Sequence, residues 1–195
     1  DSQIPNPGDY WTTRIGQQSV VNTRGKRDEI NIFYNRCPHK GARIAEEGCG
    51  HTNGLFRCPY HAWTFNLDGT LRGVPYLDGY QGTSFDLTDP RFSLRKVARV
   101  ATYRGFVFAS LAEDGAEFED FLAGVKSSLD NFCDRAPEGT VSVAGGVFRV
   151  VQRSNWKIFF ENLNDTGHPI ATHESSYRAA RQYSEEVLDG ELPFQ

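Results

Sequence analysis

The chain has 195 residues, of which 38% are apolar and 24% are charged, and this is the composition of an ordinary globular protein. Its 21 Lys and Arg residues stand against 25 Asp and Glu residues, and no basic run predicts a nucleic-acid surface. Apolar runs such as 105–111 are far shorter than the roughly 20 residues of a membrane span, and residues 1–30 show no signal peptide. We therefore expect a cytoplasmic protein without nucleic-acid or membrane partners.

The two ends of the chain indicate a longer natural protein. No methionine occurs anywhere, and the sequence stops at Leu192-Pro193-Phe194-Gln195 without a closing element. A length of 195 residues corresponds to one domain, or to one domain and part of another, at roughly 100–200 residues per domain. We expect an internal fragment that is still long enough to bury a core.

Short β-type segments separated by turn residues dominate the first half of the chain. The segments predicted as strands are 9–15, 19–23, 29–34, 62–67 and 105–111. Asp68-Gly69 lies between two strand-like segments, which is typical of a β-hairpin. We expect residues 1–115 to form a small antiparallel β domain.

From residue 116 onward the pattern changes to that of an α+β unit. Apolar residues at helical spacing predict one amphipathic helix over 117–134: Phe118, Phe121, Leu122, Val125, Leu129 and Phe132. β-branched residues at 140–152 predict a strand, and 155–168 again has a helical pattern. We expect residues 116–195 to be the start of a second, incomplete domain, so that the fold class is α+β.

Two short segments combine the cysteine and histidine residues that bind metals. Cys37 and His39 form a Cys-x-His pair, and after 18 intervening residues Cys58 and His61 form a Cys-x-x-His pair. A Rieske [2Fe–2S] centre has two thiolates on one iron and two imidazoles on the other. Two loops that each carry one thiolate and one imidazole suit such a centre. Neutral imidazoles in place of thiolates also reduce the negative charge around the cluster, which favours its reduction.

Two other interpretations of these residues compete. A zinc site uses the same donors, but its usual spacing places two cysteines in one half and two histidines in the other. Alternatively, all four are ordinary loop and core residues, although two matched pairs make this a poor explanation. Cys49 and His51 have no partner at ligand spacing and are assigned to a loop, and Cys133 is assigned to helix packing.

The sequence around the two pairs is characteristic. Residues 37–42 read CPHKGA and residues 58–65 read CPYHAWTF. These segments resemble the Rieske domain of the large (alpha) subunits of aromatic ring-hydroxylating oxygenases. Rieske proteins of respiratory and photosynthetic complexes carry an extra cysteine in each loop, where this chain has Ala42 and Tyr60. The cluster ligands that the resemblance implies are Cys37, His39, Cys58 and His61.

A second motif favours the oxygenases over the soluble Rieske ferredoxins. Residues 155–173 read NWKIFFENLNDTGHPIATH and resemble the Glu-x3-Asp-x2-His-x4-His motif of the same oxygenases. The resemblance implies that His168 and His173 bind a mononuclear non-haem iron(II), as part of a facial triad that leaves positions open for dioxygen. The third ligand, a carboxylate, is expected beyond Gln195.

The resemblance also implies roles for two neighbouring polar residues. Asp165 matches the carboxylate that bridges this iron and a Rieske histidine of the neighbouring subunit. By the resemblance, that partner histidine is expected to be His61 or its loop neighbour. Asn162 is expected to line the iron side of the active-site pocket.

The spacing of these residues agrees with the implied ligands. Asp165 and His168 are i, i+3 and are expected on one helix face, where the carboxylate can orient the imidazole. His168 and His173 are i, i+5, about 140° apart around a regular helix, so a break is needed between them. Pro169 is expected to supply that break. The competing interpretation, two surface histidines on one helix, does not require a proline there.

The resemblance implies a terminal oxygenase component. Such an enzyme uses dioxygen and electrons from a reductase, often through a ferredoxin, to hydroxylate an aromatic substrate, most often by cis-dihydroxylation. NAD(P)H then acts only indirectly, through the reductase. The resemblance further implies a homo-oligomer, a trimer in most of the family, with or without a small β subunit, and a catalytic domain of the helix-grip type.

Three alternatives remain open at the level of sequence. The chain could belong to a Rieske monooxygenase or demethylase that acts on a non-aromatic substrate. It could also be a Rieske ferredoxin-type electron carrier, but that function leaves residues 155–173 unexplained. A zinc-stabilised interaction module would be colourless.

Overall fold

The computed structural model describes residues 1–143, 146, 148 and 150–187. The chain divides into two compact units, the first from Asp1 to Gly146 and the second from Val147 onward, and each is described by itself. Among the described residues, no helix is long and apolar enough to cross a membrane.

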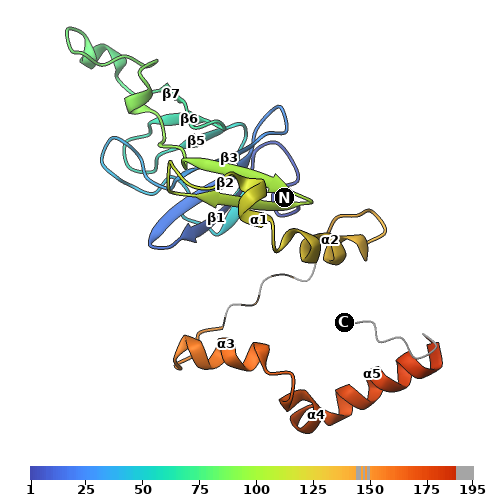
Figure 1. Ribbon diagram of the computed structural model, residues 1–195. Helices are drawn as coiled ribbons and strands as arrows, with labels where there is room; N and C mark the ends of the chain where they lie inside the picture. The colour runs from blue at the N-terminus through green and yellow to red at the C-terminus, as the bar shows by residue number, and fades with distance from the viewer. Residues whose placement is uncertain (144–145, 147, 149, 188–195) are drawn as a thin grey trace. The chain divides into compact units, whose positions relative to one another are not determined.

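Four antiparallel strands form the first sheet, in the order β3-β2-β1-β4, and Figure 1 labels the first three of them. They are β1 (Asp9–Ile15), β2 (Gln18–Arg24), β3 (Ile30–Tyr34) and β4 (Cys49–His51). A tight turn joins β1 to β2, and Gly16 adopts there the positive φ, 56°, that such turns require. The three strands predicted before residue 35 are confirmed, whereas β4 was not predicted.

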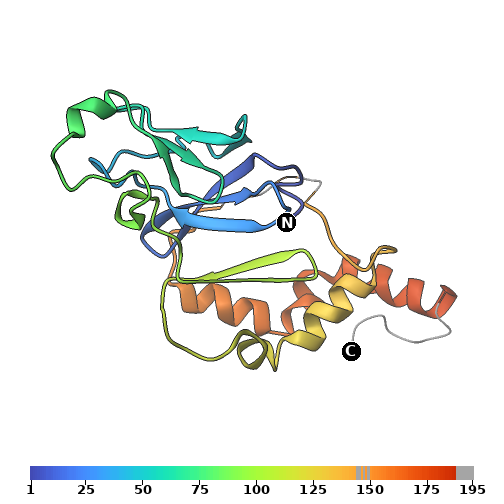
Figure 2. The ribbon, with the colours of Figure 1, turned by 90° about the horizontal axis from the view of Figure 1, so that it is seen from above.

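A second sheet of three strands lies alongside the first (Figure 2). It consists of β5 (Leu55–Arg57), β6 (Thr64–Asn66) and β7 (Leu71–Gly73). Gly69, with a φ of 85°, lies in the turn between β6 and β7, so the predicted hairpin is confirmed. The strand predicted from residue 62 begins only at Thr64 because the two preceding residues belong to a tight loop.

The rest of the first unit's β structure is a hairpin of β8 (Arg99–Tyr103) and β9 (Phe106–Ser110). β9 confirms the strand predicted at 105–111. Two short 3-10 helices, η1 (Leu77–Tyr80) and η2 (Pro90–Phe92), lie in the connection between β7 and β8. The antiparallel β architecture expected for this part of the chain is therefore confirmed.

The main core lies where the first two sheets meet. Val21 and Phe33 are cross-strand partners on β2 and β3, and both are fully buried. Phe56 packs edge-on against Phe33, with ring centroids 5.5 Å apart, and Phe65 of β6 is also fully buried. Two cysteines and a tryptophan belong to the same core, namely Cys37, Cys58 and Trp63.

The single helix predicted over 117–134 is wrong, because the structure has two helices there. They are α1 (Phe118–Leu122) and α2 (Lys126–Asp134). Gly124 lies in the gap, and glycine costs about 1 kcal/mol relative to alanine inside a helix. The apolar spacing continues through the gap, which is why the sequence pattern does not reveal the break.

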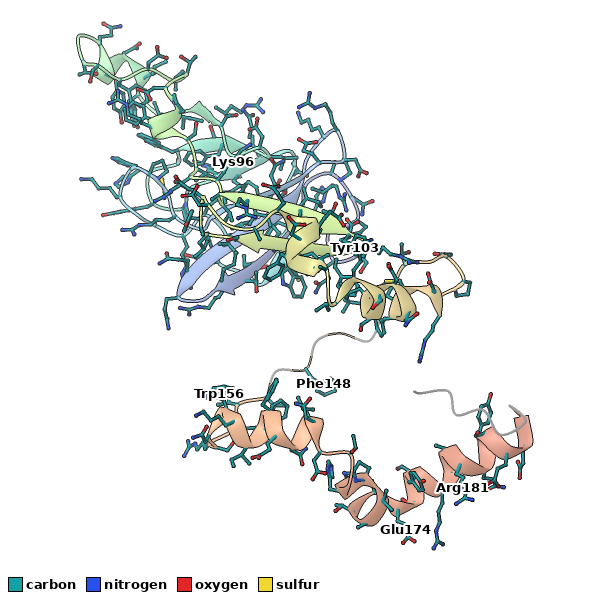
Figure 3. All side chains as sticks on the ribbon, in the orientation of Figure 1. Lys96, Tyr103, Phe148, Trp156, Glu174 and Arg181 are labelled. Carbon is teal, nitrogen blue, oxygen red and sulfur yellow. The ribbon has the colours of Figure 1, made fainter. Side chains whose placement is uncertain are left out.

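Both helices pack on the hairpin of β8 and β9. Ring centroids lie 5.1 Å apart between Phe108 and Phe118, and 6.4 Å apart between Phe106 and Phe132. Tyr103, labelled in Figure 3, donates a hydrogen bond from its hydroxyl to a carboxylate of α2. α1 and α2 therefore belong to the same compact unit as the three sheets.

The second unit contains three helices among its described residues: α3 (Trp156–Asn164), α4 (His168–Thr172) and α5 (Glu174–Val187). The helix predicted over 155–168 ends earlier than expected. Asp165 has an extended backbone, with φ −80° and ψ 106°, and the next helix begins only three residues later. The helix-grip architecture expected for the catalytic domain stays a prediction.

The strand predicted at 140–152 is wrong for the described part of that stretch, residues 140–143, 146, 148 and 150–152. Its other positions lie outside the described residues. A strand satisfies its backbone N–H and C=O groups by pairing, and no described strand pairs with this stretch. Its apolar side chains are exposed as well, at 50% for Val143 and 95% for Phe148.

Replacing Phe65 by alanine should lower the free energy of unfolding by about 3–5 kcal/mol, because it leaves a cavity between two sheets. The measurement is urea unfolding of the full-length protein followed by circular dichroism. Phe121→Ala is the control, since this phenylalanine is 72% exposed and its truncation should cost no more than about 0.5 kcal/mol. Equal losses for the two variants would contradict this account of the core.

Candidate metal centres

The first cysteine–histidine pair lies in a tight loop at the end of β3. The N–H of Cys37 donates to the carbonyl of Ala42 at 2.8 Å, and the N–H of Gly41 donates to the carbonyl of Cys37 at 2.9 Å. Gly41 has a φ of 80°, in the left-handed region that glycine enters at little cost. The loop therefore closes on itself, with Cys37 at its base and His39 within it.

The second pair lies in a loop with the same hydrogen-bond pattern. The N–H of Cys58 donates to the carbonyl of Trp63 at 2.8 Å, and the N–H of Ala62 donates to the carbonyl of Cys58 at 3.0 Å. Ala62 occupies the position of Gly41 and also has a left-handed φ, 55°. That conformation costs a residue with a Cβ roughly 1–2 kcal/mol. The second loop thus accepts local strain to repeat the turn of the first.

The two loops bring their thiols together in the core. Cys37 and Cys58 are each 2% exposed, and neither forms a disulfide. Burial, together with the neighbouring Cys58 thiol, raises the pKa of Cys37 to about 11, although the backbone N–H groups of His39 and Lys40 oppose this by hydrogen bonding to its sulfur. Thiolates form at such a site when a bound metal supplies positive charge.

The two imidazoles also lie side by side. The ring centroids of His39 and His61 are 4.6 Å apart. Nδ1 of His39 is buried and has no hydrogen-bond partner, whereas most buried polar atoms in proteins have one. Burial, and then the nearby His61 and Lys40, lower the pKa of His39 and favour the neutral imidazole that binds metals. This orphaned nitrogen fits a metal ligand.

A tryptophan that the sequence did not single out holds the first imidazole. The rings of Trp63 and His39 are parallel, with 1° between their planes and 4.8 Å between their centroids. Trp63 is 4% exposed, and the ring of Phe85 packs edge-on against the ring of Trp63, with 5.7 Å between their centroids. The equivalent positions of Gly41 and Ala62 in the two similar loops could have revealed the turn at Ala62. No spacing in the sequence predicts the stacking of Trp63 on His39.

The arrangement of donors differs from that of a single metal ion. Within the described ranges, no three His, Cys, Asp or Glu side chains converge as ligands of one ion would. The loops instead present a pair of thiols and a pair of imidazoles. This donor set suits a Rieske centre, with the thiols on one iron and the imidazoles on the other, and the same side chains are also ligands that zinc accepts.

The second motif also brings two of its predicted residues together. His168 begins α4 and His173 follows its end, and their ring centroids are 5.5 Å apart. Nδ1 of His168 is buried without a hydrogen-bond partner, and the nearest carboxylate oxygen, Oδ2 of Asp165, is 3.5 Å away. Two imidazoles with an orphaned nitrogen fit the chemistry of an iron(II) site.

Two details of the predicted helix geometry are wrong. Asp165 and His168 do not share a helix face, because Asp165 lies between α3 and α4. Its Oδ1 instead accepts hydrogen bonds from the N–H groups of Gly167 at 2.8 Å and His168 at 3.3 Å, and these hold the pKa of Asp165 below its usual value. The carboxylate is thus kept ionised beside the imidazole by the backbone of the turn.

The break between the two histidines also lies elsewhere than predicted. Pro169 is inside the first turn of α4, where its missing N–H has no helical partner to lose. The helix breaks at His173, whose backbone has φ −113° and ψ 35°. Asn162 lies on α3 and is exposed, and its place in a pocket stays a prediction.

The remaining cysteine and histidine residues lie apart from both sites. Nδ1 of His51 is 2.8 Å from a carboxylate oxygen of Asp9, and Cys49 is exposed on β4. Cys133 is fully buried on α2, with its sulfur 3.8 Å from the carbonyl oxygen of Arg104. These positions agree with packing and surface roles.

Comparison with known proteins identifies the domain that contains the first site. The family model of the Rieske [2Fe-2S] domain matches residues 1–103. The chain therefore belongs to the Rieske [2Fe–2S] family, which decides for an iron–sulfur centre over zinc. Along most of its length it is homologous to the large alpha subunits of aromatic ring-hydroxylating dioxygenases.

Three relatives define this similarity. Toluate 1,2-dioxygenase subunit alpha of Pseudomonas putida is 41% identical over 184 residues, which are 93% of this chain and 39% of that protein. N,N-dimethyl phenylurea N-demethylase subunit alpha of Sphingobium sp. (strain YBL2) is 31% identical over 97% of this chain and 40% of that protein. Naphthalene 1,2-dioxygenase from Rhodococcus sp. bound to indole matches with a TM-score of 0.78 and 34% identity, over 89% of this chain and 39% of that one. The chain thus spans about two-fifths of the length of these relatives.

Cys37→Ser should abolish the visible absorption of the Rieske cluster and its labile sulfide, because serine cannot replace the buried thiolate. The measurement is the absorption spectrum and sulfide content of the purified full-length protein. Cys49→Ser, the same change at an exposed cysteine, should leave both intact. Retention of the spectrum in Cys37→Ser would contradict the assignment of the first centre.

Proposed function

We propose that this chain is part of a terminal oxygenase component that uses dioxygen to hydroxylate an aromatic substrate, most often by cis-dihydroxylation. One observation carries the proposal: a Rieske domain and the grouping of Asp165, His168 and His173 occur in the same chain. An electron carrier needs only the first of these. The names of the relatives, toluate and naphthalene 1,2-dioxygenase, support an aromatic substrate.

Each site residue has a defined task in this proposal. Cys37 and Cys58 bind one iron of the cluster, and His39 and His61 bind the other. His168 and His173 hold a mononuclear iron, which supplies the chemistry of dioxygen when it is bound. A carboxylate from elsewhere in the protein completes that ligand set.

Two further residues act around the second site. Asp165 stays ionised because its Oδ1 accepts hydrogen bonds from two backbone N–H groups. Its Oδ2 therefore remains available to the imidazole of His168. In our proposal Asp165 also bridges to a Rieske histidine of a neighbouring subunit and so connects the two centres. Asn162 lies one turn earlier and lines the pocket.

The proposed activity requires other proteins. A reductase, with or without a ferredoxin, supplies electrons to the cluster, and NAD(P)H acts only through that reductase. Electron transfer between neighbouring subunits requires a homo-oligomer, which we propose to be a trimer, with or without a small β subunit. We propose that the catalytic domain begins near residue 115 in the sequence, so that its first two helices, α1 and α2, pack on the hairpin of β8 and β9 within the first compact unit.

A second candidate function is a Rieske monooxygenase that demethylates its substrate. One of the three relatives named above is an N,N-dimethyl phenylurea N-demethylase subunit, which is 31% identical over 97% of this chain. Identity is higher to the toluate dioxygenase subunit, at 41%, and we therefore favour dioxygenation. Product analysis with benzoate-type substrates and with N-methylated aromatic substrates separates the two.

The full-length protein should contain about three irons and two labile sulfides per chain. His168→Ala should lower the iron content to about two and abolish oxygenation, while the Rieske spectrum remains, because this histidine lies outside the cluster loops. Iron and sulfide analysis together with visible absorption measures both effects. Two irons in the unaltered protein and no effect of His168→Ala would support an electron carrier instead.

Asp165→Asn should retain both metals and lose turnover by at least tenfold with the physiological reductant, because asparagine carries no charge to orient the imidazole or bridge the centres. Iron content and substrate hydroxylation are measured on the same preparation. Glu185→Gln, at an exposed carboxylate that pairs with Arg181 on α5, is the matched control and should be active. Full turnover by Asp165→Asn would refute the bridging role.

A further inference from the structure

A groove in the first unit runs beside the first cluster loop. It is bounded by the end of β3, by the loop itself and by η2. Cys37 and His39 are among the residues that line it. A protein seated in this groove would therefore contact the loop that carries two candidate ligands of the cluster.

The groove is strongly cationic although the whole chain is acidic. Four cationic side chains line it, Arg36, Lys40, Arg91 and Arg95, and no Asp or Glu does. All four are exposed. The chain as a whole has a formal net charge of −4, so positive charge is concentrated here against the overall balance.

Three of the four cations keep their charge uncompensated. Arg91 pairs with Asp89, with 2.6 Å between nitrogen and oxygen. Among the described residues, no ion pair involves Arg36, Lys40 or Arg95. Arg95 instead lies over the ring of Tyr34, 5.2 Å from its centroid, which leaves its charge available. Clusters of unpaired like charge attract partners of the opposite charge and accelerate their association.

We propose that this groove docks the protein that delivers electrons to the cluster, and that this donor is an acidic iron–sulfur protein. The inference rests on the proposed function, because it assumes that a separate protein reduces the cluster. One electron leaves the reduced donor and enters the cluster, and no bond forms or breaks. Uncompensated Arg36, Lys40 and Arg95 select the acidic surface, and the position of Cys37 and His39 on the same groove brings that surface to the cluster loop.

The test measures how fast the Rieske cluster of the full-length protein is reduced, by stopped-flow bleaching of its visible absorption. A reduced plant-type [2Fe–2S] ferredoxin serves as the acidic probe, since its potential lies below that of Rieske centres. Arg36→Glu/Arg95→Glu should slow reduction at least tenfold at low ionic strength. The double variant Lys26→Glu/Arg27→Glu is the control, because these exposed residues lie in the turn at the opposite end of β3 and should leave the rate within twofold.

Two further measurements make the result decisive. Reduction of the unaltered protein by ferredoxin should slow as salt is added, because salt screens exposed charges over about 10 Å at 0.1 M. Reduction by the methyl viologen radical, a small cation, should not slow in Arg36→Glu/Arg95→Glu, because the introduced carboxylates attract a cation rather than repel it. A salt-independent rate of reduction by ferredoxin would overturn the proposal, and so would equal slowing in both double variants. If Arg36→Glu/Arg95→Glu loses its cluster, the salt dependence of the unaltered protein decides alone.

The oligomeric state tests whether the groove binds a second copy of this chain instead of an electron donor. If Arg36→Glu/Arg95→Glu dissociates the oligomer in size-exclusion chromatography, the groove faces a second copy of this chain and the proposal fails. Cluster reduction is measured without substrate or dioxygen, so it is also readable in a protein that carries electrons only. Failure of the proposed oxygenase function would appear in iron content and in His168→Ala, and not in this rate.

Discussion

The burial of two thiols side by side is the constraint on which the first unit depends. Cys37 and Cys58 are each 2% exposed and belong to the same core as Phe33 and Phe65. Burial raises the pKa of Cys37 to about 11, so thiolates at this place require the positive charge of a metal. Packing and metal binding are therefore linked in this fold, because the candidate ligand thiols are themselves part of the core.

The loops show how the chain accommodates that constraint. Both use the same hydrogen-bonded turn, but the second places Ala62 where the first has Gly41, and its left-handed φ is strained. The strain is tolerated because the turn sets the direction of the imidazole and the thiol. Trp63, one residue further on, then stacks flat on His39 from the other loop. A residue of the second loop thus positions a candidate ligand of the first.

The sequence predicted the elements and sites that depend on local pattern. Alternating strands, the Asp68-Gly69 turn and the two Cys–His pairs need only neighbouring residues, and the structure agrees with the strands and the turn. The errors occur where a local pattern is overridden. Gly124 interrupts a helix whose apolar spacing continues, and Pro169 fits inside the first turn of α4 because a proline there loses no hydrogen bond. The stretch 140–152 has strand-like residues, but a strand forms only where a partner edge exists.

By itself the sequence predicted which side chains are candidate metal ligands and in which two motifs they lie, because the type and spacing of such residues are properties of neighbouring positions. Only the tertiary structure decided how distant segments meet. It placed the thiols in one core, stacked Trp63 on His39, and gathered Arg36, Lys40 and Arg95 from two segments into one cationic groove. No local pattern contains these contacts, because they depend on how the sheets pack. That packing buries the two cysteines and leaves the arginines exposed to solvent.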